Sequence, residues 1–157
     1  MTINKETAEK KLLTYTHLDY SIKMDANWEV KKINESQTFF FGPKVGKARV
    51  GFYITSINKD GKDYLYAAER IKEDQSLEKD YKLIEESDLS KNGYKAFMRR
   101  SYWYNEEIDM SLFVRDVFTE STNKIFILSC SIPNSPELAG IDKTLVQMMN
   151  SFKFSLS

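Results

Sequence analysis

Three long runs of strand-forming residues, joined by short turns, set the strongest limit on what this chain can fold into. They occupy residues 94–104, 110–119 and 124–132, and residues 81–87 form a shorter run before them. Aromatic and β-branched residues, which strands favour, are frequent in these runs. The dipeptide Asn92-Gly93 is a strong hairpin signal. Long strands joined by tight turns predict an antiparallel meander in the second half of the chain.

The middle strand of this meander does not separate into one apolar and one polar face. Met110, Leu112 and Val114 lie on one side of it, whereas Phe113 and Val117 lie on the other. Strands with apolar residues on both sides are typical of a sheet that is covered on both faces. The sequence therefore predicts helices or further strands above and below the meander.

A helix at the end of the chain is predicted to supply one of these covers. Ser135 is a good N-cap residue, and Pro136 suits the first position of a helix. Apolar residues then recur at helical spacing: Leu138, Ile141, Leu145, Met148, Met149 and Phe152. This stripe is expected to pack on a sheet. Residues 151–155 return to alternation and predict a short last strand.

The first half of the chain predicts shorter strands and one helix. We expect short strands at residues 12–16 and 20–24, and a hairpin of residues 38–42 and 48–58. Between them, Trp28, Val30 and Ile33 are expected to attach their segment to the core.

Residues 63–76 are predicted to form a helix. Tyr64, Ala67, Ala68 and Ile71 follow the i, i+3, i+4, i+7 pattern of a helix with one apolar stripe. Asp60-Gly61 supports an alternative, in which a hairpin turn leads into a strand at residues 64–68. The intrinsic propensity of Ala67-Ala68-Glu69-Arg70 favours the helix.

No repeat or linker rich in proline and glycine divides the 157 residues. We predict a flexible N-terminal arm at residues 1–10 and a single domain at residues 11–157. The order of elements predicts an α+β fold, in which helices and strands form packed layers.

The charges of the chain balance, with 23 Lys and Arg residues against 23 Asp and Glu residues. A nucleic-acid-binding protein draws much of its affinity from an excess of basic residues, so we predict no nucleic-acid partner. No apolar run approaches the roughly 20 residues of a transmembrane helix. The first residues lack the apolar core of a secretory signal, and this pattern predicts a cytoplasmic protein. The alternative is an extracytoplasmic lipoprotein domain whose leader was removed.

The residues that carry chemistry are few and scattered. One histidine and one cysteine cannot form a structural zinc centre, and no glycine-rich loop precedes a helix. His17 lies in a predicted turn beside Asp19, where we expect exposure to solvent. Cys130 lies in an alternating apolar run and is interpreted as a buried apolar residue. These patterns predict no metal, no cofactor and no enzymatic activity.

Paired carboxylates are the remaining candidates for catalysis. Asp116 and Glu120 would suit acid–base chemistry if they faced one cleft. A cross-strand pair of Asp116 with Arg99 or Arg100 is the simpler interpretation of these charges.

The candidate binding site is an aromatic and basic stretch that runs into an acidic turn. It consists of Arg99, Arg100, Tyr102, Trp103 and Tyr104. Tyr, Trp and Arg are enriched at protein interfaces, because each combines a large contact area with a polar group. The alternative is a central strand in which these side chains pack on both faces.

Three segments resemble the PsbP-like superfamily, which includes PsbP of photosystem II, the DcrB-like bacterial proteins and the yeast release factor for the Ran GTPase. Residues 18–28 are similar to the opening strand and the turn that ends in Trp, although Ala26-Asn27 stand where family members commonly have Pro. Residues 81–96 resemble the central strand and Asn-Gly hairpin, and residues 145–154 resemble the terminal helix and closing Ser-Phe.

The resemblance implies an α/β/α sandwich with a central, mostly antiparallel sheet. It also implies a non-catalytic protein-binding, assembly or chaperone-like module, and it supplies no catalytic residues. Another protein is then the expected partner, recognised through a sheet face or a groove beside the terminal helix. The alternative is a small-molecule-binding protein or small enzyme with a pocket near Arg100, Tyr102 and Asp116.

Overall fold

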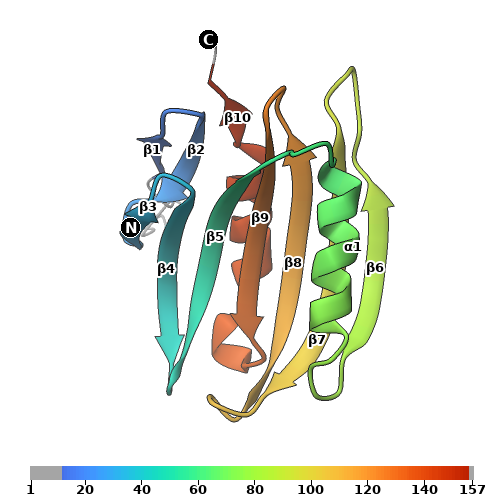
Figure 1. Ribbon diagram of the computed structural model, residues 1–157. Coiled ribbons are helices and arrows are strands. Elements are labelled where there is room, and N and C mark those ends of the chain that lie inside the picture. Colours follow the sequence, from blue (N-terminus) through green and yellow to red (C-terminus); the bar gives the residue numbers. More distant parts are fainter. Residues whose placement is uncertain (1–11, 156–157) are drawn as a thin grey trace.

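The computed structural model describes residues 12–155 of the chain (Figure 1). The predicted arm at residues 1–10 lies outside the described residues. The first half contains β1 (Leu12–Thr16), β2 (Tyr20–Asp25), β3 (Glu29–Asn34), β4 (Gln37–Val45), β5 (Ala48–Asn58) and α1 (Tyr64–Gln75). The second half contains β6 (Lys82–Asp88), β7 (Ala96–Asn105), β8 (Met110–Glu120), β9 (Lys124–Pro133), α2 (Ile141–Asn150) and β10 (Lys153–Phe154).

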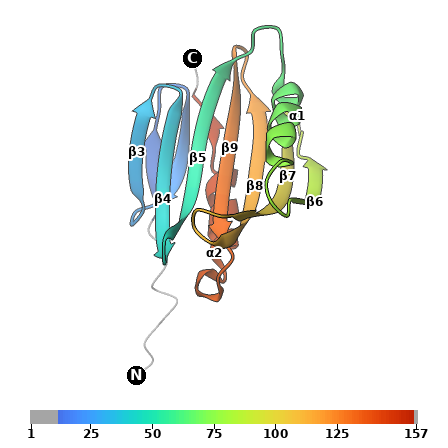
Figure 2. The same cartoon turned by 60° about the horizontal axis from the view of Figure 1, so that its bottom comes forward.

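The strands form two antiparallel sheets. The larger sheet has seven strands in the order β3-β4-β5-β9-β8-β7-β6, and the smaller one has the order β1-β2-β10. Helix α1 packs on β7, β8 and β9, on one face of the larger sheet. Helix α2 packs on β9 and on β2 of the smaller sheet, behind the larger sheet in the view of Figure 1. This arrangement confirms the predicted α+β sandwich, and β3 and β6 are the two edges of the larger sheet (Figure 2).

The centre of the larger sheet is buried on both faces at β8, as the mixed pattern of the meander predicts. Neighbouring residues of β8 belong to two separate apolar cores. Phe118 packs with Ala67 and Ala68 of α1, whereas Val117 packs in the core that contains Leu145 of α2. Because side chains alternate along a strand, β8 contributes residues to both cores.

The predicted helix at residues 63–76 is confirmed as α1. The Asp63 carboxylate caps it by accepting a hydrogen bond from the backbone N–H of Tyr66 at 2.9 Å. Ala67 and Ala68 are buried against the sheet. The alternative hairpin is wrong, because the turn that contains Gly61 leads into the helix and not into a strand.

The predicted attachment of the segment after β2 to the core is only partly correct. Val30 and Ile33 do not attach their segment to the core, because β3 is an edge strand and both side chains are about two-fifths exposed. Only Trp28 is buried there, over Gly42, where an added Cβ would lie 2.6 Å from the indole ring.

The terminal helix begins later than predicted. Ser135 caps a short 3₁₀ helix, Pro136–Leu138, and the chain then turns at Gly140, whose φ is 87°, before α2 starts. The predicted apolar stripe is buried throughout, and β10 confirms the short last strand.

The predicted exposure of His17 is also wrong, because only 7% of the residue is exposed. Its ring stacks on Tyr20 with the ring centres 4.5 Å apart. Nδ1 accepts a hydrogen bond from the Asp19 N–H at 3.0 Å, and Nε2 donates to the Glu35 carbonyl at 2.9 Å. His17 therefore joins the smaller sheet to the turn between β3 and β4.

Tyr20 makes folding depend on pH in the alkaline range. It is 2% exposed, and burial raises the pKa of its phenol from 10.0 to about 12. The unfolded chain therefore releases this proton at a lower pH than the folded chain. Stability from this group is complete below pH 10 and is lost between pH 10 and 12, by about 3 kcal/mol.

The variant Tyr20→Phe is expected to lack this contribution to the alkaline loss. Urea unfolding of both proteins over this pH range measures it, because all other ionisable groups are shared. A constant difference in unfolding free energy between the two proteins would contradict the expectation.

Candidate functional site

The predicted binding stretch lies along β7, where alternation sends its side chains to opposite faces of the sheet. Arg99 is on the face covered by α1, and its guanidinium bonds to the backbone of that helix. Arg100 is on the other face and lies near the start of α2. Tyr102 shares the face of Arg100, and Trp103 that of Arg99. The five residues therefore do not form one continuous surface.

Arg99 is an internal residue with no exposed surface. Its Nη1 donates to the carbonyl of Ala68 at 2.8 Å, and its Nε donates to Glu86 at 3.0 Å. The guanidinium also lies 5.5 and 5.6 Å from the ring centres of Phe97 and Phe118. These contacts attach α1 and the edge strand β6 to the centre of the sheet.

Asp116 is the cross-strand neighbour of Arg99 and not of Arg100. It is 1% exposed and accepts a hydrogen bond from Gln75 at 2.9 Å. Burial raises the pKa of its carboxyl group, and hydrogen bonds from Ser129 and Gln75 oppose that rise. The predicted pocket of Arg100, Tyr102 and Asp116 is wrong, because Asp116 points to the opposite face.

Asp116 and Glu120 also have separate partners. The Glu120 carboxylate binds Lys59 and the backbone N–H of Tyr64, at the start of α1. Both carboxylates thus serve to fix α1 on the sheet.

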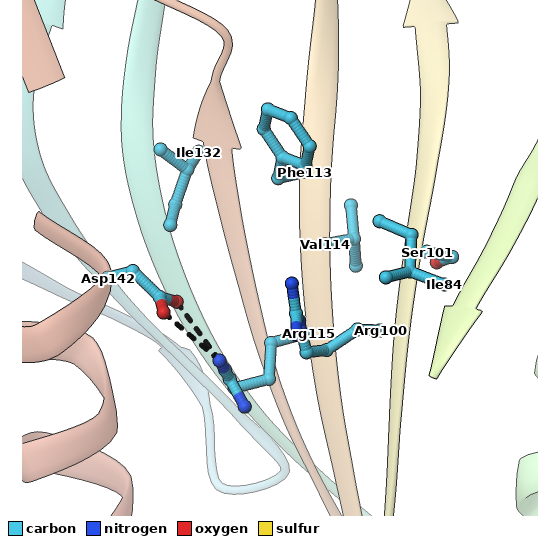
Figure 3. Close-up of a pocket in the computed structure, with 8 residues that line it drawn as sticks. All are labelled: Ile84, Arg100, Ser101, Phe113, Val114, Arg115, Ile132 and Asp142. Carbon is cyan, nitrogen blue, oxygen red and sulfur yellow. Dashed lines mark hydrogen bonds and ion pairs between the residues drawn. The ribbon is translucent and has the colours of Figure 1, made fainter. Parts of the chain in front are cut away.

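A groove opens on the face of Arg100, beside the first turn of α2 (Figure 3). Its volume is about 190 Å³. It is lined by side chains from β6, β7, β8, β9 and α2: Ile84, Arg100, Phe113, Arg115, Ile132 and Asp142. We call this set the groove.

The groove exists because the cover over β7 and β8 ends partway along these strands. Met98 and Val117 are buried in the core that contains α2. Further along the same face, Arg100 and Arg115 are half-buried, and Phe113 is 38% exposed. Between α2 and β6, the edge strand of the larger sheet, this face is therefore partly exposed to solvent.

Two arginines define the electrostatics of the groove. Arg100 and Arg115 are direct cross-strand neighbours. Arg100 donates to Glu85 of β6 at 2.9 Å. Arg115 donates to the two carboxylate oxygens of Asp142 at 3.1 and 3.3 Å, and dashed lines mark this contact in Figure 3. The Nε of Arg115 is buried and has no acceptor among residues 12–155.

The groove also exposes apolar surface. Phe113 and Ile84 are 38% and 43% exposed. Tyr102 packs against Phe113 with the ring centres 5.0 Å apart. Exposed apolar side chains around charged groups are typical of recognition surfaces.

Tyr104 and Trp103 lie near the acidic turn at the end of β7. Tyr104 donates its hydroxyl hydrogen to the Asp109 carboxylate, and the ammonium of Lys79 lies 5.0 Å from the centre of its ring. Trp103 is half-buried on the α1 face. Binding through the predicted stretch stays a prediction. Arg99 has no exposed surface, so a partner could contact only Arg100, Tyr102, Trp103 and Tyr104.

Sequence reasoning did not select most of the groove. Arg115, Ile132 and Asp142 come from three elements, and none was a candidate. The sequence does hold one signal, because Arg115 is a lone basic residue within an apolar strand. Its pairing with Arg100 could be found only from the register.

The described residues offer no metal site and no membrane span. Among residues 12–155, no group of three or more His, Cys, Asp or Glu residues is placed to hold a metal ion. No helix in this part of the chain is long and apolar enough to cross a membrane. Cys130 is 1% exposed, as predicted, and burial raises the pKa of its thiol well above the usual value.

Solved structures of three proteins share this architecture. Mog1p, a Ran-binding protein of Saccharomyces cerevisiae, aligns with a TM-score of 0.62 and 9% identity over 92% of this chain and 96% of its own. LpqN, involved in cell envelope biogenesis of Mycobacterium tuberculosis, aligns with a TM-score of 0.61 and 9% identity over 96% and 94%. Cyanobacterial PsbP (CyanoP) from Synechocystis sp. PCC 6803 aligns with a TM-score of 0.60 and 10% identity over 99% of both chains.

The layers, the strand order and these alignments define the chain as an α/β/α sandwich with antiparallel sheets. In particular, it has the PsbP-like fold, which confirms the fold that the resemblance in the sequence implies. No protein-family model and no curated protein matches the sequence.

Proposed function

We propose that the protein is a non-catalytic protein-binding module and that it recognises its partner through the groove. The observation that carries this proposal is the exposure of Phe113 and Ile84 beside two arginines in one groove. Buried aromatic and arginine side chains contribute most of the binding energy at protein interfaces. Mog1p, which shares the fold, is itself a Ran-binding protein.

The size of the groove favours a protein partner over a small molecule. Pockets for small ligands usually have volumes of about 300–1,000 Å³, whereas the groove has about 190 Å³. A hollow of that size accommodates one or two side chains of a partner. The cytoplasmic and extracytoplasmic locations both stay predictions.

Site-specific photo-crosslinking tests this surface. The photoreactive residue p-benzoylphenylalanine is introduced in place of Phe113 in the groove, or in place of Tyr66 on α1. The two positions are 38% and 45% exposed and lie on opposite sides of the larger sheet. In host extract, we expect one recurrent protein adduct from position 113 and none from position 66.

Competition makes the result specific. Excess unlabelled protein is expected to suppress the adduct, and Tyr66→Asp to suppress it equally well. Phe113→Asp is expected to fail as a competitor. If both positions give the same adducts, or if Phe113→Asp competes fully, the groove is not the binding surface.

A further inference from the structure

We propose that the groove binds a carboxylate side chain of an acidic peptide segment, together with an apolar side chain next to it. The inference rests on the proposed function and names the partner's chemistry. Its observations are the paired arginines, their ion pairs with exposed carboxylates and the exposed apolar residues around them.

The two arginines place like charges directly opposite each other on neighbouring strands, an arrangement that is unfavourable unless anions are close. Within the chain, each arginine has its own carboxylate, from Glu85 or from Asp142. The Glu85 and Asp142 side chains are 43% and 56% exposed. Such solvated pairs are weak, so a partner's carboxylate can replace them at little cost.

The guanidinium of Arg115 is only partly engaged by the chain itself. Asp142 accepts hydrogen bonds from Nη2 of Arg115, whereas Nε is buried and has no acceptor among the described residues. Because Nε lies inside the chain, a partner's carboxylate would accept from Nη1 and Nη2 instead, which is also a bidentate contact of the kind that arginine favours.

The apolar wall defines the rest of the ligand. Phe113 and Ile84 expose surface beside the arginines, and Tyr102 supports the ring of Phe113. A leucine or phenylalanine next to the acidic residue would cover this surface. The combination of charge and apolar contact therefore fits an acidic peptide segment better than a free inorganic anion.

Asp142 also disfavours a phosphate group in the groove. It lies in the first turn of α2 and bonds to Arg115. A dianion beside this carboxylate would be repelled more strongly than a single carboxylate. Inorganic phosphate is accordingly the appropriate competing probe.

The test is an NMR titration of the ¹⁵N-labelled protein with short synthetic peptides. The acidic peptide is Ac-Gly-Leu-Glu-Phe-Glu-Gly-NH₂, and its control has Gln in place of both Glu residues. We expect the acidic peptide to shift the backbone amides of Arg100, Phe113, Arg115 and Asp142. We expect the Gln peptide to bind about 10- to 100-fold more weakly, because charge-assisted hydrogen bonds are lost.

Variants of the arginines separate charge from geometry. Arg115→Gln is expected to reduce the affinity for the acidic peptide to that for the Gln peptide. Arg115→Lys keeps the charge but loses the bidentate contact, so an intermediate affinity is expected. Arg70→Gln alters an exposed arginine of α1, which is 60% exposed, and is expected to change nothing.

The inference is overturned if the acidic and Gln peptides bind equally, if inorganic phosphate binds as tightly as the acidic peptide, or if millimolar peptide leaves the groove amides unshifted. The proposed function fails separately, in the competition with Phe113→Asp. If position 113 gives the crosslink but the acidic and Gln peptides bind equally, the proposed function stands and the acidic partner is refuted.

Discussion

Replacing Arg99 with methionine is expected to lower the free energy of unfolding by about 3–5 kcal/mol, because one partner of a buried charge network is removed. The methylene groups are largely retained, but the carbonyl of Ala68 and the carboxylate of Glu86 lose their donors. Asp116, which is 1% exposed, also loses its nearby cation. Urea unfolding followed by circular dichroism measures the change.

Arg100→Met is the matched control on the same strand. The side chain of Arg100 is 38% exposed and binds the exposed Glu85. Removing such a surface pair is expected to cost about 0–1 kcal/mol. Equal losses from the two substitutions would contradict the internal role of Arg99.

Replacing Phe118 with alanine is expected to cost about 3–5 kcal/mol, because the deletion leaves a cavity in the core beneath α1. Phe118 has no exposed surface and packs with Ala67, Ala68 and Ile125. The same unfolding measurement applies, and the loss is expected to appear as a lower transition midpoint with little change in slope.

Phe113→Ala provides the comparison, since both phenylalanines lie on β8. Phe113 is 38% exposed and makes its ring contact with Tyr102, so its removal is expected to cost about 1 kcal/mol. A loss as large as that of Phe118→Ala would show that Phe113 belongs to the core and is not a free contact residue of the groove.

Both comparisons depend on which face of a strand a side chain occupies. Because side chains alternate along β7 and β8, Arg99 and Arg100 lie on different faces of the sheet, and so do Phe118 and Phe113. That neighbours in sequence lie on opposite faces follows from the strand period. The depth of burial on each face depends on what packs there.

Much of the fold could be predicted from local patterns. The spacing of Tyr64, Ala67, Ala68 and Ile71 identified α1, and the Asn92-Gly93 turn marked the hairpin before β7. These predictions succeeded because helix periodicity, strand alternation and turn chemistry act over a few residues.

Predictions that depended on distant neighbours were less successful. Val30 and Ile33 are apolar, yet they lie on an edge strand and are about two-fifths exposed. His17 has the sequence of an exposed turn, but Glu35, 18 residues later, accepts its hydrogen bond and the ring is buried. Neither outcome has a local signal.

The sequence by itself determined the elements of this protein: the antiparallel meander, the two helices and the need for cover on both faces of the sheet. Only the tertiary structure decided that Arg99 is internal and that Arg100, Arg115 and Asp142 line one groove. The physical reason is that elements form from short-range preferences, whereas burial and charge pairing depend on long-range contacts. Arg115 and Asp142 are 27 residues apart, and only the packing of α2 against the sheet brings them together.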